Sequence, residues 1–411
     1  MPQRSARTEL RRLLLPPLLA AQAAAAHAQA QPQIDYLSLA QGAVPVGVGG
    51  DAKALGVSME QALLAIDGDP RTFVLTPRPG GAQSRITFVY RLPAATTFKA
   101  FSIPSVLETP SPAQTFVRKV EIAGADSSAE GPFRVLAEAA LSTHAAKGQA
   151  TSLAVAAEIP VRWVRLTLEG GIDVQRDKTF LEFSELVGHG TQQAVPLSQG
   201  FRGKWKGRGV LLELMQQGAV VSGCYDREGD LEGTVSGNVL RATGRDRKDK
   251  VPSVFVLALG DDGAISGVRS TNGAPFRLYA GDAAPGAVTQ CAVRAVRPPG
   301  CGSVLHGVSF DFDSATLRPE SDLLLDALAS GLKAAPASAI VVIGHTSSEG
   351  ADAYNEQLSQ RRAEAVVAAL VARGIPRAGL SAQGLGEKQP IADNATEAGR
   401  SLNRRVEIAC R

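Results

Sequence analysis

Apolar and polar positions follow different periods in different parts of this chain. In the first half, short apolar runs are separated by clusters of Gly, Pro, Asp and Ser, as at residues 85–90, 133–137 and 162–168. Regular short strands with turn residues between them are typical of antiparallel sandwiches. The pattern therefore predicts a β-sandwich of the jelly-roll type over residues 35–195.

A second stretch of alternating apolar residues covers residues 200–282. Its strands are expected in consecutive pairs, and the turns between them carry the Gly and Asn residues that tight hairpins need, at 217–218, 236–238 and 261–263. A meander of consecutive hairpins is typical of a small up-and-down β-barrel or half-barrel. Residues 283–300, with Pro and Gly at both ends, are expected to form a linker.

The helical period dominates the last part of the chain, residues 301–411. An apolar run at 340–343 predicts a strand that ends in the polar loop 345–350. A long helix is expected next, with one buried stripe formed by Ala363, Val366, Val367 and Leu370. Gly374 is expected to end this helix in the left-handed conformation, and an earlier helix is expected over residues 317–332.

Composition and charge narrow the class of protein. The chain has 411 residues, which is too long for one core and predicts roughly two to four domains. With 44% hydrophobic and 20% charged residues, the composition is that of a globular protein. The net charge of +3 is too small over this length to favour nucleic acid or an anionic membrane surface as a partner.

Residues 1–30 have the organisation of a signal peptide. Four arginines (Arg4, Arg7, Arg11 and Arg12) precede a short apolar run at 13–26, and two small-x-small cleavage sites follow. The run is far shorter than the about 20 residues that a membrane-spanning helix needs. Export is therefore expected, with the mature chain starting near Gln29 or Gln31 outside the cytoplasm; no cysteine follows the cleavage region, so a lipid-anchored N-terminus is not expected.

The four cysteines, Cys224, Cys291, Cys301 and Cys410, are expected to form disulfides, because their number is even and export is predicted. Four cysteines permit three connectivities. Cys224–Cys291 with Cys301–Cys410 is preferred, since each bond would then bracket one predicted domain. Metal binding is disfavoured because no pair has C-x-x-C spacing.

The last quarter of the chain carries a set of short motifs in a fixed order. They are Gly344-His345-Thr346, Tyr354-Asn355, Leu358-Ser359-x-x-Arg362-Ala363, Gly384-x-Gly386-Glu387 and Asn403-Arg404-Arg405-Val406-Glu407-Ile408. This set resembles the OmpA-like C-terminal domain, and residues 309–313 resemble its first strand. The resemblance implies an α+β domain of order β-α-β-α-β-β that binds the peptide stem of peptidoglycan without cleaving it.

The resemblance also implies a site for diaminopimelate, which carries a carboxylate and an ammonium at one centre. Arg362 takes the position whose guanidinium binds the carboxylate with two parallel hydrogen bonds. The ammonium usually meets an Asp, but Ser347 stands at that position, so affinity is expected to be weaker unless Glu349 or Asp352 replaces the missing charge. The other candidate contacts are Thr346, Asn355, Asp313 and Arg405. For Arg405, a solvated cation at the strand end is an equal alternative.

Three motifs in the first half resemble discoidin-type, galactose-binding-like domains. They lie at residues 65–72, 160–166 and 183–190. The resemblance implies a structural calcium ion held by oxygen atoms of Asp67, Asp69, the Thr72 carbonyl and Glu185. An Asp-rich turn stabilised by its own hydrogen bonds is the alternative.

Three classes of function remain. The first is a non-catalytic cell-envelope protein that binds peptidoglycan and tethers two β modules in the periplasm. The second is a carbohydrate-binding or adhesion protein that uses the sandwich. An enzyme is not expected, because no Gly-x-Ser-x-Gly, His-Glu-x-x-His or phosphate loop is present. The expected partners are peptidoglycan, with glycans or envelope proteins at the β modules; contact with the outer membrane is expected to be peripheral at most. No cofactor is expected apart from the calcium ion.

Overall fold

The computed structural model describes most of the chain, and residues 34–411 form one compact unit. The described residues are 34–69, 72–104, 114–141, 149–171, 180–207, 209–227, 229–291, 296–311, 313–335 and 339–410. The predicted signal peptide at 1–30 lies outside them. In the described part of the chain, no helix is both long and apolar enough to cross a membrane.

The first region is built around one long strand, β3 (Arg85–Pro104), whose side chains alternate between buried and more exposed positions. Its paired strands run in the order β1-β3-β7-β4-β8-β2, with β5 on β4 and with β6 and β9 on β3. The other elements are η1 (Leu39–Gln41), β1 (Val44–Gly50), α1 (Ala52–Leu55), α2 (Met59–Leu64), β2 (Val74–Leu75), β4 (Gln114–Ala125), β5 (Arg134–Ala140), β6 (Ala150–Ala154), β7 (Pro160–Gly171), β8 (Phe180–Phe183) and β9 (Val187–Gln192). The prediction of a region built mainly of strands is confirmed, with two short α-helices and one 3₁₀ turn that the sequence did not predict, and the description as a sandwich stays a prediction.

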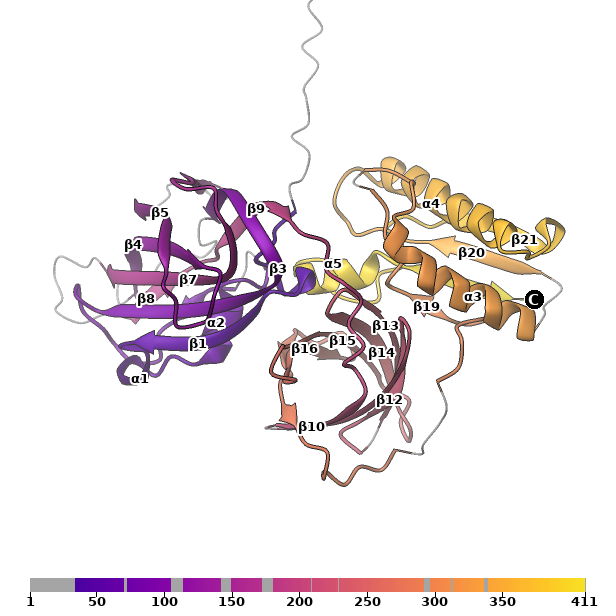
Figure 1. Cartoon of the computed structure of the whole chain (residues 1–411), viewed down its shortest axis with the longest axis horizontal. Helices are drawn as coiled ribbons and strands as arrows, with labels where there is room; N and C mark the ends of the chain where they lie inside the picture. Colours follow the sequence, from indigo (N-terminus) through magenta and orange to yellow (C-terminus); the bar gives the residue numbers. More distant parts are fainter. Residues whose placement is uncertain are drawn as a thin grey trace, which may run out of the picture. The chain divides into compact units, whose positions relative to one another are not determined.

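The second region is a meander in which spatial order follows chain order, from β10 to β17, with β18 beside β10 (Figure 1). Gly218, Gly237 and Gly263 occupy its turns with positive φ, as the hairpin signals predict. The strands are β10 (Gly203–Gly207), β11 (Val210–Gln217), β12 (Val220–Tyr225), β13 (Gly229–Ser236), β14 (Val239–Asp246), β15 (Pro252–Leu259), β16 (Ile265–Thr271), β17 (Arg277–Leu278) and β18 (Asp282–Ala283). Ile265 and Gly281 exchange two backbone hydrogen bonds, which link β16 to the segment that leads into β18. Closure into a barrel stays a prediction.

The third region has a four-stranded sheet of order β19-β22-β20-β21, with helices α3 and α4 beside it (Figure 1). Only the β20–β21 pair is parallel. The elements are β19 (Val304–Leu305), η2 (Pro319–Ser321), α3 (Asp322–Ala334), β20 (Ile340–Gly344), α4 (Asp352–Ala372), η3 (Arg377–Gly379), β21 (Leu380–Gly384), α5 (Glu397–Asn403) and β22 (Val406–Cys410). Gly374 has φ 85°, so the predicted end of α4 is confirmed.

The first strand of this sheet is not where the sequence predicts it. Residues 309–311 and 313 form no ladder with the sheet; Phe310 makes an isolated bridge to Leu317, and the sheet strand is β19 at Val304–Leu305. The reason is local: Arg318 N–H donates to Ser309 O and Asp311 N–H donates to Thr316 O, so this backbone bonds to its own returning segment. Residue 312 lies outside the described part. The predicted helix at 317–332 starts later, at Asp322, after the 3₁₀ turn that contains Pro319.

Both predicted disulfides, Cys224–Cys291 and Cys301–Cys410, are confirmed. The predicted domain boundaries stay a prediction, and one hydrophobic core includes residues from all three regions. Ala398 and Leu402 of α5 belong to the core of the first region, together with Val254 and Val256 of β15. The third region has a core of its own, which runs from Leu305 to Ile408 and includes Ala219 of the second region, and it also buries α5 against the other two regions.

Candidate functional site

The polar loop 345–350 is held at both sides by backbone hydrogen bonds. His345 N–H donates to Arg405 O (3.0 Å) and Thr346 N–H donates to Gly386 O (2.9 Å). The start of the loop is therefore hydrogen-bonded to the residue before β22 and to the turn after β21. Thr346 and Ser347 are 5% and 4% exposed, and Thr346 Oγ1 has no hydrogen-bond partner among the described residues.

Asn355 supports this loop from α4. It is 2% exposed, and its Nδ2 donates to Glu387 Oε2 (2.6 Å) and to Ser347 O (3.4 Å). Because both contacts are internal, Asn355 orders the loop backbone, and its role as a direct ligand contact stays a prediction.

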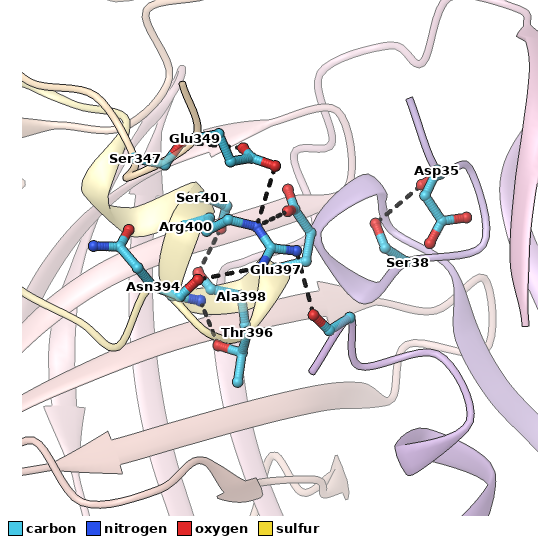
Figure 2. Close-up of polar contacts among 12 residues, drawn as sticks. Asp35, Ser38, Ser347, Glu349, Asn394, Thr396, Glu397, Ala398, Arg400 and Ser401 are labelled. Carbon is cyan, nitrogen blue, oxygen red and sulfur yellow. Dashed lines mark hydrogen bonds and ion pairs between the residues drawn. The ribbon is translucent and has the colours of Figure 1, made fainter. Parts of the chain in front are cut away.

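A carboxylate does stand next to Ser347. Ser347 Oγ donates to Glu349 Oε2 (3.1 Å), but Glu349 also lies 3.4 Å from Arg404 Nη1 and 3.7 Å from Arg400 Nε. Figure 2 shows the carboxylates of Glu349 and of Glu397 from α5 next to each other, and both approach Nε of Arg400. The replacement of the missing Asp by Glu349 stays a prediction, and two guanidinium groups already share the Glu349 charge.

Arg362 projects from α4 toward the segment that the sequence placed in the first strand. Its Nε donates to Ser314 O (3.0 Å), and its guanidinium carbon lies 5.0 Å from the centre of the Phe310 ring. Among the described residues, no acid forms an ion pair with Arg362 and no acceptor bonds its Nη1 or Nη2. Burial and the nearby charge of Arg404 lower the pKa of Arg362 to about 10, so the group stays a cation at neutral pH.

Asp313 lies on the same side of the domain and accepts a hydrogen bond from the Tyr354 hydroxyl. This bond raises the pKa of Tyr354 above its usual value. The Asp313 charge also favours the cationic form of Arg362, which brings Asp313, Tyr354 and Arg362 into one group.

Arg405 lies inside the protein. It is 4% exposed, its Nε donates to Glu407 Oε1 (2.7 Å) and its Nη2 donates to Gln389 O (3.0 Å). Burial lowers its pKa and Glu407 opposes this shift. The alternative of a solvated cation is therefore wrong, and all three nitrogens of its guanidinium have internal acceptors.

The predicted calcium ligands lie around one turn of the first region. Asp67 Oδ1 accepts from Asp69 N–H (2.9 Å), Asp67 Oδ2 accepts from Thr72 Oγ1 (2.8 Å), and Glu185 Oε1 accepts from Gly68 N–H (2.5 Å). Burial raises the pKa of Asp67 to about 7 and that of Glu185 well above its usual value.

These hydrogen bonds fit a self-stabilised turn better than a metal site. In the described part of the chain, the one group of three metal-ligating side chains within 4.8 Å of one another is Glu213, Cys224 and Cys291, whose two cysteines form a disulfide. Asp67, Asp69 and Glu185 do not converge in that way. A structural calcium ion at this turn stays a prediction.

Sequence reasoning missed the ion-pair network that joins the loop to the first region. Arg400 contacts Glu349, bonds Glu397 Oε2 through Nε (2.8 Å), and donates from Nη2 to Gly68 O (3.3 Å). Glu397 also pairs with Arg404 (2.5 Å), and the two arginines hold the pKa of Glu397 below its usual value against the effect of burial. The available signal was the Glu397-x-x-Arg400 spacing, which places both side chains on one helix face.

Comparison with known proteins identifies one part of the chain. Residues 309–404 match the OmpA family model, which confirms the OmpA-like resemblance of the C-terminal region. Outer membrane porin F of Pseudomonas fluorescens is 50% identical over 102 residues, which are 25% of this chain and 31% of that protein. The first curated relatives are matched over 31%, 51% and 47% of their own lengths.

Two solved structures have low TM-scores to this chain. The peptidoglycan-associated lipoprotein from Burkholderia pseudomallei is 38% identical, covers 25% of this chain and 88% of its own, and has a TM-score of 0.24. A CBM32 module from a family 31 glycoside hydrolase of Clostridium perfringens is 12% identical, covers 39% of this chain and 95% of its own, and has a TM-score of 0.29. A likeness of this strength supports no inference, so the discoidin-like assignment and carbohydrate binding stay predictions.

Proposed function

We propose that this chain is a non-catalytic protein of the cell envelope that binds peptidoglycan through its C-terminal region and tethers its two β regions in the periplasm. The proposal is supported by the OmpA family match over residues 309–404 and by relatives named as outer membrane proteins. The ligand that we propose is the diaminopimelate of the peptide stem, because its carboxylate and ammonium suit the groups around the loop 345–350.

The observation that carries the proposal is the free end of Arg362. Its Nε donates a hydrogen bond to Ser314 O, and the face of its guanidinium stacks on the Phe310 ring. These two contacts fix the plane of the guanidinium. The two terminal nitrogens then remain for a ligand carboxylate, and a planar fork can donate two parallel hydrogen bonds to it. A side chain already held in its binding geometry loses less conformational entropy when the ligand arrives.

A sedimentation assay with purified sacculi tests this site. The full chain is used, because α5 packs into the core of the first region. We expect Arg362→Ala to lower the affinity for sacculi by about tenfold or more, since a charge-assisted bond is lost. A smaller fraction of the variant should therefore sediment. Arg362→Lys is expected to recover part of the affinity, because it keeps the charge without the fork.

The matched control is Arg361→Ala, which removes an exposed arginine from the neighbouring position of α4. Its binding should equal that of the unmodified chain. If Arg362→Ala sediments as well as Arg361→Ala does, the site assignment is wrong; if the unmodified chain itself stays in solution, peptidoglycan binding is wrong.

A further inference from the structure

Arg400 of α5 contacts both the loop 345–350 and a turn of the first region. Its side chain is 17% exposed. Its Nη2 donates to Gly68 O (3.3 Å) in that turn, and its Nε donates to Glu397 Oε2 (2.8 Å). The same Nε lies 3.7 Å from Glu349 Oε1 in the loop (Figure 2). One guanidinium therefore connects the loop to a glycine that lies 332 positions before Arg400 in the sequence.

The segment that precedes α5 forms a second connection to the same loop. Arg400 Nη1 donates to Asn394 O (3.2 Å) and to Ala395 O (3.0 Å). The side chain of Asn394 in turn accepts a hydrogen bond from Ser348 N–H of the loop (3.3 Å). Arg400 therefore holds the loop directly through Glu349 and indirectly through Asn394, and all three nitrogens of its guanidinium are engaged.

Gly68 packs against the start of α5 with no room for a side chain. Its φ is 70°, and a Cβ added to it would lie 2.7 Å from Glu397 Cβ and 3.2 Å from Glu397 N. The neighbouring Asp67 O accepts a hydrogen bond from Glu397 N–H (3.3 Å). A side chain at position 68 would therefore displace α5, and Arg400 would move with it.

We propose that Arg400 is a positioning residue for the peptidoglycan site, and that it makes the affinity for peptidoglycan depend on the Asp67–Gly68 turn of the first region. This inference rests on the proposed function. A loop that is already held in one conformation loses less conformational entropy when its ligand binds. Because coupling between two sites is reciprocal, a ligand bound at the loop should in turn stabilise the contact between α5 and the turn.

Gly68→Ala changes the turn without touching the loop. We expect its affinity for purified sacculi, measured by sedimentation of the full chain, to fall about threefold to tenfold, because Arg400 is displaced. Gly263→Ala is the matched control, since Gly263 has φ 78° and a Cβ added to it would meet nothing within 4 Å. Both variants carry a comparable backbone strain, so a difference in affinity reports the contact with Glu397. Equal affinities in the two variants overturn the inference.

Hydrogen exchange provides a readout that a general loss of stability does not produce. Saturating amounts of soluble muropeptides, released from the same sacculi, should slow amide exchange at residues 66–69 of the full chain by about threefold or more. Arg400→Gln should abolish this change at its own saturating concentration. Arg373→Gln, which removes an arginine that is 21% exposed and pairs with Asp322 and Asp326, should retain it.

The two measurements separate failure of this inference from failure of the proposed function. If the unmodified chain sediments with sacculi but muropeptides leave exchange at residues 66–69 unchanged, the coupling is wrong and peptidoglycan binding stands. If the change persists in Arg400→Gln, the coupling does not pass through Arg400 and the inference is again wrong. If the unmodified chain does not sediment, the proposed function itself is wrong.

Discussion

Ser347 is the residue at which this domain departs from the motif it otherwise follows. The sequence identifies the substitution, but it could not tell that Glu349 Oε2 lies 3.1 Å from the Ser347 hydroxyl, or that Arg400 and Arg404 share the Glu349 charge. Those arginines are more than 50 positions away in the sequence. Only the folded loop brings them to Glu349.

Restoring the acid at this position is expected to strengthen binding. In Ser347→Asp, a ligand ammonium gains a charge-assisted partner beside Arg404, so affinity for sacculi should rise by about tenfold. The measurement is sedimentation of the full chain with increasing amounts of sacculi. Ser348→Asp adds the same charge to the exposed neighbouring position and serves as the control. Equal gains in affinity in both variants would indicate a non-specific effect of the added negative charge. No gain in either variant would contradict the role of position 347.

The sequence predicted the role of Arg362 better than it predicted the surroundings of Arg362 and Arg405. The motif predicted Arg362 as the ligand-binding cation, and no described residue accepts a hydrogen bond from its terminal nitrogens. Its contacts with Phe310 and Ser314 were unpredictable, because residues 309–313 were expected in a strand. The internal position of Arg405 had one visible sign: Arg405 directly precedes the predicted last strand and is two residues from Glu407, a spacing that places two side chains of an extended chain on the same side.

Among the elements, α5 (Glu397–Asn403) was absent from the expected β-α-β-α-β-β order. Its start is readable, since Thr396 Oγ1 accepts from Gly399 N–H (2.9 Å) as an N-cap residue does. Its packing is not readable. A seven-residue helix has little stability of its own, and the surface that stabilises it belongs to strands far away in the sequence.

Removing one side chain of α5 is expected to destabilise more than the C-terminal region. Leu402 is 0% exposed within the core of the first region, so Leu402→Ala should lower the free energy of unfolding by about 3 kcal/mol through lost burial and a residual cavity. Chemical denaturation followed by fluorescence and circular dichroism measures the change. Val371→Ala, at a side chain 37% exposed on α4, should change it by less than about 0.5 kcal/mol. Similar losses in the two variants would contradict this packing.

For the whole molecule, the sequence predicted three successive regions and both disulfides, because these depend on local period, turn residues and cysteine number. It did not predict how the regions share their cores. The core of the first region includes residues of β14, β15 and β16 of the meander as well as α5, and contacts of this kind leave no local pattern. Hydrophobic periodicity indicates which face of an element is buried, but not which element covers it.

Buried carboxylates make the stability of the whole molecule depend on pH. Burial raises the pKa of Asp35 to about 7, and Asp67 and Glu185 are raised as well. Below pH 4 these acids are protonated in both states. Between pH 4 and 7 the unfolded chain releases protons that the folded chain retains, so this contribution to stability is lost as the pH rises through 7. Glu397, whose pKa is lowered, contributes with the opposite sign: its stabilisation grows while the unfolded carboxyl ionises at about pH 4–5 and is constant at higher pH.

Asp35→Asn isolates one of these acids. Its Oδ1 accepts from Gly188 N–H (2.8 Å) and Leu37 N–H (3.0 Å), and an asparagine Oδ1 can accept both bonds without a charge. Between pH 5 and pH 8 the free energy of unfolding should fall by about 2 kcal/mol less in the variant than in the unmodified chain. Chemical denaturation at each pH measures this difference. Asp249→Asn, at an exposed position, should follow the unmodified chain. Parallel pH profiles for Asp35→Asn and the unmodified chain would show that Asp35 titrates normally.

The Cys301–Cys410 bond determines how tension would pass through an anchored domain. A pull from the cell wall would enter at the loop after β20, and β20 is bonded along five residue pairs to β22, which ends at Cys410. These antiparallel neighbours would be loaded in shear, which engages their hydrogen bonds together, and the force would then cross the sulfur bridge directly to Cys301. Helices α3 and α4 lie off this route. If the chain binds the cell wall as proposed, load would pass through β20, β22 and the Cys301–Cys410 bond, and α3 and α4 would carry little of it.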